Sequence, residues 1–285
     1  MVIKIVLIVI LMLIVFFVGV MIHDCHSLVV RKYEFDVPNI SGDISLVMLS
    51  DLHGVRFGKN NQKLVDKINA LSPDAVVIAG DMYTASEKSG IENAKEFLSE
   101  LVKTNDIYYA DGNHEEKTKE LKEEFGNRYE DYVLDLSNKG VKFINNNNVY
   151  IEDKNVCIYG LALPFEYYKK FKNITPGKAG IEKLLGEAPT EKVVVLLAHN
   201  PEYFKDYAKW GADVVCSGHY HGGLMRLPIV GGVISPRYKL FPRYDYGVYE
   251  EGKSHMVLSC GLGTHTLPIR IFNPGEVSYI HLKQV

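Results

Sequence analysis

The sequence predicts an α/β fold behind an N-terminal transmembrane helix. Short apolar runs rich in β-branched residues alternate with segments whose apolar residues recur at helical spacing, which is typical of strand–helix units. Several of these runs end in glycine and polar side chains, as strands do when their carboxyl ends carry a binding site. The third observation is a continuous apolar segment at residues 5–22.

Composition limits the range of functions. The chain has 285 residues, which allows one large domain or two small ones, and a formal net charge of -3. Because this charge gives no global basic field, we expect no nucleic-acid partner. Four cysteines do not make a disulfide framework in a chain of this length, and Cys157, Cys216 and Cys260 lie in apolar runs where we expect buried free thiols.

The apolar segment at residues 5–22 is long enough to cross a bilayer. About 18 residues at roughly 1.5 Å each just span a hydrocarbon core of about 30 Å. A cleaved signal peptide is the alternative, but its apolar region should be shorter and end in small residues, and residues 20–23 contain no such pattern. We therefore expect an uncleaved anchor at residues 1–27 and a catalytic domain at residues 28–285.

Charge gives little information on the orientation of this anchor. Lys4 and the terminal amine precede the span, and Arg31 and Lys32 follow it, so the positive-inside signal is nearly balanced. Because short N-terminal anchors usually leave the following domain outside, we expect a single-pass protein of the cell membrane with an extracytoplasmic catalytic domain.

The first half of the body predicts three strand–helix units. An edge strand is expected at residues 33–37, where apolar and charged residues alternate. Buried strands are expected at residues 44–50, 76–79 and 107–110. Two helices should bury apolar residues at helical spacing, namely Leu64, Val65, Ile68 and Leu71 in one and Ile91, Ala94, Phe97, Leu98 and Leu101 in the other.

At the start of the second half, the alternation of strand and helix patterns is interrupted. Residues 141–144 and 149–151 flank four asparagines and predict a hairpin. Strands are then expected at residues 156–161, 193–198, 212–216, 256–260 and 277–282, and Pro201 should open a helix.

The predicted strand ends supply a set of ligand-type side chains: Asp51, His53, Asp81, Asn113, His114, His199, His219 and His221. Carboxylate, imidazole and amide oxygen are ligands for Mn, Fe or Zn. Asp-x-His and His-x-His each place two ligands on one loop, pointing to one side of an extended backbone. The set is too large for one tetrahedral site but suits two ions that share a carboxylate, for which Asp81 is the natural bridge. Two such ions can hold a hydroxide and clamp both oxygens of a displacement at phosphorus.

The motifs, in order, are Asp51-x-His53, Gly80-Asp81, Gly112-Asn113-His114-Glu115, His199 and Gly218-His219-x-His221. This pattern resembles the calcineurin-like metallophosphoesterase family over roughly residues 46–282. Residues 197–201, 261–263 and 268–270 further resemble its bacterial membrane-associated branch, which includes YkuE-type proteins and UDP-diacylglucosamine pyrophosphatase-like enzymes.

The resemblance implies a fold and a division of roles. The fold is a two-sheet β-sandwich flanked by helices. Two divalent metal ions are implied, one held by Asp51, His53 and His221 and one by Asn113, His199 and His219, with Asp81 between them. His114 would face the leaving-group oxygen as proton donor or charge stabiliser, with Glu115 orienting it; support of Asn113 is the alternative role for His114.

The function expected from these residues is that of a membrane-anchored phosphoesterase. It would hydrolyse phosphoester or pyrophosphate bonds by attack of a metal-bridging hydroxide on a phosphate-containing, possibly lipid-linked substrate. Two alternatives stay open: a lipid-linked nucleotide-sugar pyrophosphatase of the UDP-diacylglucosamine type, and an inactive metal-bound scaffold. Candidates for the substrate rim are Arg226, Arg237, Tyr238 and Arg243.

Overall fold

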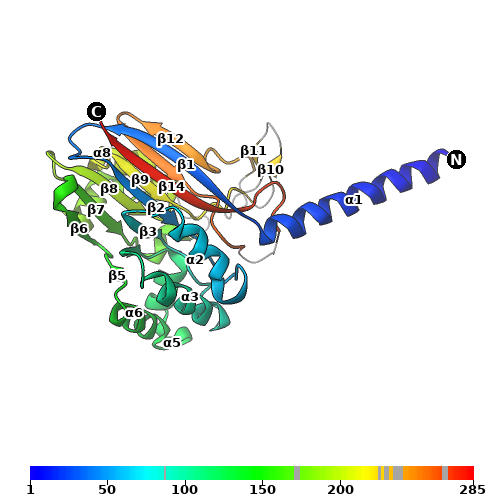
Figure 1. The fold of residues 1–285 in the computed structure, drawn as a ribbon, viewed down its shortest axis with the longest axis horizontal. Coiled ribbons are helices and arrows are strands. Elements are labelled where there is room, and N and C mark those ends of the chain that lie inside the picture. Colours follow the sequence, from blue (N-terminus) through cyan, green and yellow to red (C-terminus); the bar gives the residue numbers. More distant parts are fainter. Residues whose placement is uncertain (87, 170–173, 224–225, 228–230, 234–239, 265–268) are drawn as a thin grey trace.

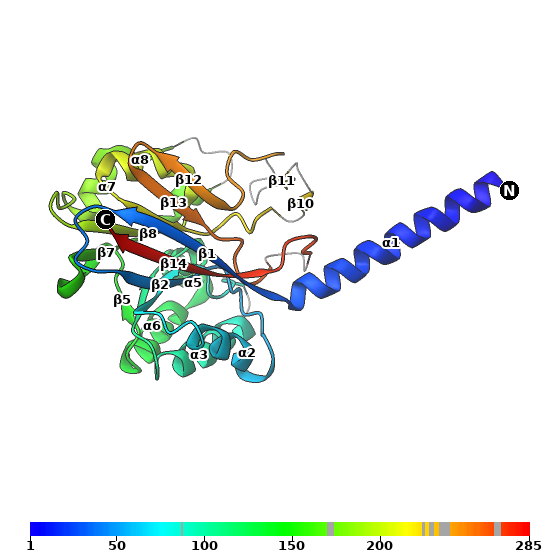
Figure 2. The same cartoon turned by 45° about the horizontal axis from the view of Figure 1, so that its top comes forward.

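The computed structural model describes residues 1–86, 88–169, 174–223, 226–227, 231–233, 240–264 and 269–285. Two stacked sheets lie between two layers of helices, and a long helix projects from one end (Figures 1 and 2). The predicted α/β class and the two-sheet sandwich are confirmed.

The projecting helix is α1 (Val2–His26). It contains the whole apolar segment, is exposed over most of that length, and is long and apolar enough to cross a membrane. It extends away from the body in both views (Figures 1 and 2). Within a water-soluble body such a surface would be buried, so its exposure fits a helix whose surroundings are lipid.

The first sheet mixes parallel and antiparallel strands. Its spatial order is β1 (Leu28–Val37), β14 (Gly275–Gln284), β2 (Ile44–Leu49), β3 (Ala75–Ala79), β4 (Ile107–Ala110) and β5 (Lys142–Phe143). The strands β2 to β5 are parallel, whereas β14 runs antiparallel to β2 and parallel to β1. The expected edge strand is β1, and it does lie at the edge.

The second sheet is also mixed, with antiparallel strands at both edges. Its spatial order is β12 (Gly247–Glu251), β13 (Ser254–Leu258), β9 (Val214–Ser217), β8 (Val193–Ala198), β7 (Val156–Leu161) and β6 (Asn147–Ile151). The four strands β13, β9, β8 and β7 are parallel. A small ribbon beside the sandwich pairs β10 (Arg226–Leu227) with β11 (Gly231–Gly232).

The predicted hairpin around the asparagine run is wrong. The strand β5 pairs with β4 in the first sheet, whereas β6 pairs with β7 in the second. Asn145 explains the crossing, because its side chain accepts a hydrogen bond from Asp111 N at 2.8 Å and donates to Asp111 Oδ2 at 2.7 Å. The next residue, Asn146, donates its backbone N–H to Gly160 O in the second sheet at 2.8 Å. The run therefore connects the two sheets.

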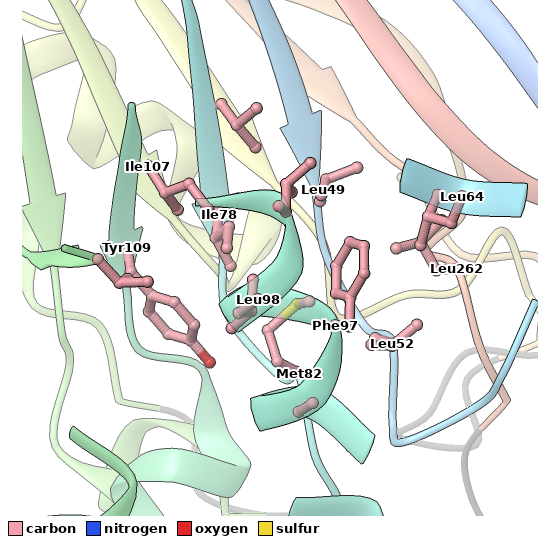
Figure 3. Packing of buried hydrophobic residues seen from close by; sticks show 14 of the residues in the cluster. Leu49, Leu52, Leu64, Ile78, Met82, Phe97, Leu98, Ile107, Tyr109 and Leu262 are labelled. Carbon is pink, nitrogen blue, oxygen red and sulfur yellow. The ribbon is translucent and has the colours of Figure 1, made fainter. Parts of the chain in front are cut away.

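Helices cover the outer face of each sheet. On the first sheet lie α2 (Gln62–Asn69), α3 (Lys88–Leu101) and α6 (Arg128–Asn138), and on the second α7 (Gly177–Leu185) and α8 (Phe204–Trp210). Figure 3 shows Phe97 and Leu98 of α3 packed against Ile78 and Leu49 of the sheet. Burial of each such side chain stabilises the fold by roughly 1.5–3 kcal/mol. A further apolar layer fills the space between the sheets.

Shorter helices complete the connections, namely α4 (Asn113–Glu120), α5 (Lys122–Phe125), and the 3-10 turns at Lys59–Asn61, Glu152–Lys154, Phe165–Tyr168 and Pro201–Tyr203. Pro201 opens a helical segment as predicted, and the Asn200 side chain accepts from Glu202 N at its start. The predicted free thiols are confirmed, because Cys157, Cys216 and Cys260 are buried and unbridged.

Strand register places α1 at the same edge of the sandwich as the carboxyl end of β2. Gly275 lies opposite Leu28, the first residue of β1, and Ser278 lies opposite Met48, the penultimate residue of β2. Since β1 begins two residues after α1 ends, the helix leaves the body where β2 and its parallel neighbours terminate. These are the strand ends that carry the predicted ligands.

Candidate metal centre

The structure brings all the predicted ligand-type residues to one edge of the sandwich. They come from five loops or helix starts: Asp51 and His53 after β2, Asp81 after β3, Asn113 and His114 at the start of α4, His199 after β8, and His219 and His221 after β9. Their ligand atoms form three overlapping groups in which every atom lies within 4.8 Å of the others: Asp51, His53 and His221; His53, Asp81 and His114; Asp81, His199 and His219.

The backbone at this edge is unusual. Asp51, His53, Asp81, His219 and His221 have φ values of 52°, 49°, 57°, 71° and 51°, in the left-handed region that non-glycine residues rarely adopt. The expected extended backbone for Asp-x-His and His-x-His is therefore wrong, because both members of each pair turn the chain sharply. Such conformations cost on the order of 1 kcal/mol or more each and concentrate at functional sites.

The first group surrounds Asp51. Its Oδ1 lies 3.4 Å from His221 Nε2 and 3.8 Å from His53 Nε2, and the two imidazole nitrogens are 3.3 Å apart. The carboxylate also accepts hydrogen bonds from His219 N at 3.1 and 3.0 Å. A Cβ on Gly218 would lie 2.3 Å from Asp51 Oδ2, so this close approach of the two loops requires glycine.

The third group contains Asp81, His199 and His219. His199 Nε2 is 3.0 Å from Asp81 Oδ2. The Asn113 amide adjoins the same atoms: turned one way its nitrogen donates to Asp81 Oδ2 at 3.3 Å and to His219 Nδ1 at 2.7 Å, and turned by 180° it offers its oxygen there. Carboxylate, amide and imidazole ligands therefore converge.

Asp81 belongs to the third group and also faces the first. Its Oδ2 lies 3.0 Å from His199 Nε2 of the third group and 4.0 Å from His53 Nε2 of the first. Its Oδ1 accepts from His114 N at 2.8 Å, so the carboxylate is held in this orientation. This is the position that a shared carboxylate requires, and the donor set fits two cations of the Mn, Fe or Zn type.

Two of the imidazoles are oriented through their second nitrogen. His199 Nδ1 donates to Ala79 O at 2.6 Å, so its Nε2 is the atom left to face Asp81. His53 Nδ1 lies 3.1 Å from Thr84 Oγ1, which leaves its Nε2 towards Asp51 and Asp81. Ring orientation by such partners is the usual arrangement around metal-binding histidines.

The electrostatics of the site favour cations. Burial alone would raise the pKa of Asp51, but the imidazoles of His221 and His199 hold it well below its ordinary value. The pKa of Asp81 is also lowered, by His199 and His114 against the effect of burial. Burial would lower the pKa of His199, yet the carboxylates of Asp81 and Asp51 raise it to about 10. Two buried, ionised carboxylates thus attract positive charge at this edge.

His114 stands beside both Asp81 and His53. Its Nδ1 accepts a hydrogen bond from Ala85 N at 3.0 Å, so the neutral ring carries its proton on Nε2. The ring packs edge to face on His53 with 5.1 Å between centroids. His114 can therefore present an N–H to a group bound near His53 and Asp81.

Glu115 does not orient the His114 ring, contrary to the sequence-based expectation. Its Oε2 accepts from Asp81 N at 2.9 Å and Gly112 N at 3.0 Å, and its Oε1 from Met82 N at 2.9 Å and the Tyr109 hydroxyl at 2.6 Å. Burial and the Asp81 carboxylate raise the pKa of Glu115 to about 8, whereas four donors favour its ionised form. Glu115 therefore supports the backbone of the Asp81 loop.

Sequence reasoning missed Asn273 and Asp24. Asn273 Nδ2 donates to His221 O at 2.6 Å and Gly223 O at 3.0 Å, and Asn273 N donates to Asp24 Oδ2 in α1 at 2.9 Å. Nearby, the fully buried Arg270 donates to backbone carbonyls, including those of Cys260 and Gly261. In the sequence, only the arginine of the 268–270 motif pointed to this region. That arginine, Arg270, has a structural role near Asp51.

The candidates for the substrate rim have different surroundings. Arg226 Nη1 donates to Asp245 Oδ2 at 2.8 Å, and its guanidinium lies 3.8 Å from the Tyr246 ring centroid. The Arg243 guanidinium lies 5.1 Å from the Tyr244 ring centroid. Arg237 and Tyr238 lie outside the described residues.

Comparisons with known proteins agree on one family. Residues 44–223 match the family model described as Calcineurin-like phosphoesterase. The chain is 30% identical over 265 residues to a transmembrane protein with metallophosphoesterase domain from Danio rerio, covering 87% of this chain and 55% of that protein. It is 31% identical over 266 residues to the metallophosphoesterase Cj0846 of Campylobacter jejuni, covering 89% of this chain and 63% of that protein.

A shorter match joins the chain to the metallophosphoesterase YkuE of Bacillus subtilis, with 31% identity over 107 residues, 38% of this chain and 37% of that protein. The chain thus spans 55% and 63% of the length of the Danio and Campylobacter relatives.

Proposed function

The chain belongs to the calcineurin-like phosphoesterase family, and from this premise we propose that it is a membrane-anchored phosphoesterase that depends on two divalent ions. The observation that carries the proposal is Asp81, whose Oδ2 faces His199 at 3.0 Å and His53 at 4.0 Å and so joins two groups of ligand atoms. A protein that only acts as a scaffold would not need two adjoining groups of ligand atoms on strained loops.

We assign the ligands as the donor atoms are grouped. Asp51, His53 and His221 would hold one ion and Asn113, His199 and His219 the other, with Asp81 shared. Bound there, two ions of Mn, Fe or Zn would supply Lewis acidity at the phosphorus centre and an activated water.

The remaining chemistry falls to side chains of the chain. His114 holds its proton on Nε2, because Nδ1 accepts from Ala85 N, and His114 would donate this proton to the oxygen that leaves phosphorus. The Ala79 carbonyl fixes the ring of His199, and Glu115 fixes the loop of Asp81. These contacts keep the donor atoms in place before substrate arrives.

The test is hydrolysis by the full chain in detergent, loaded in turn with Mn, Fe or Zn and assayed on phosphomonoesters, phosphodiesters and nucleotide sugars. Asp81→Ala should abolish turnover. Asp213→Ala is the matched control, because its carboxylate accepts one backbone hydrogen bond, from Val194 N at 2.8 Å, at the amino end of β8 and away from the site. Absence of turnover with every metal and ester would favour the inactive scaffold.

A lipid-linked substrate is the second candidate, and the place of α1 favours it. The helix leaves the body at the edge that carries the ligands, so an anchored chain would hold its site near the membrane surface. We also propose that residues 1–27 are a single-pass anchor and that the domain at residues 28–285 is extracytoplasmic, because short N-terminal anchors usually leave the following domain outside. Faster turnover of a lipid-linked pyrophosphate than of its soluble headgroup analogue would support this candidate.

A further inference from the structure

Three exposed large apolar side chains lie on segments at the α1 end of the body. Among the described residues of the body, Leu240 is 63% exposed, Phe241 60% and Phe272 39%. We call these three residues the membrane-contact edge. Single exposed apolar residues are ordinary, but a group of them on one face calls for a partner.

Backbone pairing places the segments that carry these residues beside one ribbon. Phe241 N donates to Val233 O at 3.0 Å, next to β11, which pairs with β10. Arg226 N of β10 donates to Ile271 O at 3.0 Å, and Ile271 precedes Phe272. The segments carrying Phe241 and Phe272 therefore flank the β10–β11 ribbon, which lies at the α1 end of the body in both views (Figures 1 and 2).

The contact with α1 indicates how deep this surface would lie in the bilayer. The rings of Phe272 and Phe17 meet edge to face with 6.3 Å between centroids. Phe17 lies five residues before the end of the apolar segment at residue 22, which is about 7.5 Å along a helix at 1.5 Å per residue. If α1 spans the bilayer, Phe272 must therefore lie below the level at which the span ends.

We propose that the membrane-contact edge inserts into the lipid bilayer beside α1, so that the body is seated on the membrane by its site-bearing edge. This inference rests on the proposed spanning role of α1. Lipid is the occupant that the structure favours, because Phe272 already contacts a side chain of the apolar span and Phe241 lies on a segment that flanks the same ribbon. Shallow burial of aromatic and leucine side chains is how protein surfaces bind bilayers.

A bound edge would be held rigidly to the candidate metal centre. Asn273, next to Phe272, donates its backbone N–H to Asp24 of α1 and its side-chain amide to the carbonyl of His221. The loop that touches lipid is thus the loop that supports a predicted ligand.

Tryptophan fluorescence tests the insertion. The chain has one tryptophan, Trp210, which is the last residue of α8 and is buried, so the wild type supplies a constant background. Full-length Phe272→Trp and Phe241→Trp variants are reconstituted in phosphatidylcholine vesicles, with or without acyl chains brominated near the headgroup end. Phe16→Trp in α1 is the positive control, and Leu134→Trp, at a position 62% exposed on α6 far from α1, is the negative control.

We expect the brominated lipid to quench the added fluorescence of Phe272→Trp and Phe241→Trp by at least half of the loss seen for Phe16→Trp, and to leave Leu134→Trp unchanged. Quenching at Phe16→Trp alone would overturn the inference, and would leave a protein surface or a second copy as the cover. Quenching at none of these positions would overturn the spanning role of α1 as well. The fluorescence measurement needs no turnover, so its outcome is independent of the proposed phosphoesterase activity.

Discussion

Replacing Glu115 by glutamine tests how the site is supported. The carboxylate is fully buried and accepts from three backbone N–H groups, those of Asp81, Met82 and Gly112, and from the Tyr109 hydroxyl. In Glu115→Gln one oxygen becomes an amide nitrogen, which cannot accept. The amide should take the Oε1 position, because the Tyr109 hydroxyl can turn to accept from it, whereas Met82 N can only donate.

The loss in free energy of unfolding follows from the number of buried N–H groups that lose their acceptor. Glu115→Gln leaves the buried Met82 N–H unpaired, which costs about 1–3 kcal/mol. For a body of this size about 2–4 °C of melting temperature corresponds to each kcal/mol, so a fall of about 2–12 °C is expected. Glu115→Ala leaves three backbone N–H groups unpaired at about 3–9 kcal/mol, comparable to the whole stability of a typical domain.

Thermal unfolding of the metal-loaded full chain measures this fall in melting temperature. Glu116→Gln is the matched control on the same helix, because Glu116 is also buried but its side chain pairs with the half-exposed Lys119 at 2.8 Å, so the substitution takes no acceptor from a backbone N–H. We expect the order wild type, Glu116→Gln, Glu115→Gln, Glu115→Ala in falling melting temperature. Equal melting of the wild type and Glu115→Gln would refute the reasoning.

Three further predictions follow from the proposed site and anchor. Asp81→Ala should lose nearly all bound metal, whereas His53→Ala should weaken one ion more than the other; full metal content in Asp81→Ala by elemental analysis would contradict the shared carboxylate. Protease added to intact cells should reach the body, and mass spectrometry should find residues 5–22 still attached; a protected body would reverse the orientation. His114→Asn should keep both metals while turnover falls by about two to four orders of magnitude, the usual worth of a positioned general acid. This loss should shrink for esters with acidic leaving groups, and an equal loss across the series would exclude leaving-group protonation.

Much of the sandwich could be predicted because its signals are local. An apolar run such as residues 193–198 predicts a buried strand by itself, and β8 has those bounds. The same holds for α3, whose Phe97 and Leu98 lie at helical spacing and pack on the sheet. The hairpin failed because strand pairing is not local: Asn145 bonds to Asp111 of the first sheet, whereas Asn146 bonds to Gly160 of the second.

The candidate site was likewise predictable from the sequence only in part. Sequence alone determined which side chains follow the strands, including Asp51, Asp81 and His199, because ligand type and strand ending are both properties of short segments. Only the tertiary structure decided that Asp81 faces both groups of ligand atoms. Distances between loops depend on how the two sheets stack, and that stacking is set by apolar packing spread over the whole chain.

The supporting contacts were also decided by tertiary structure. Asn273 meets Asp24, 249 positions away, and His221, 52 positions away, and nothing in the residues next to it predicts either contact. The sequence by itself determined the apolar character of α1 and the polar strand ends. That the two lie at one edge was decided by β14, which runs antiparallel to β2 and parallel to β1 and so returns the chain to the place where α1 ends.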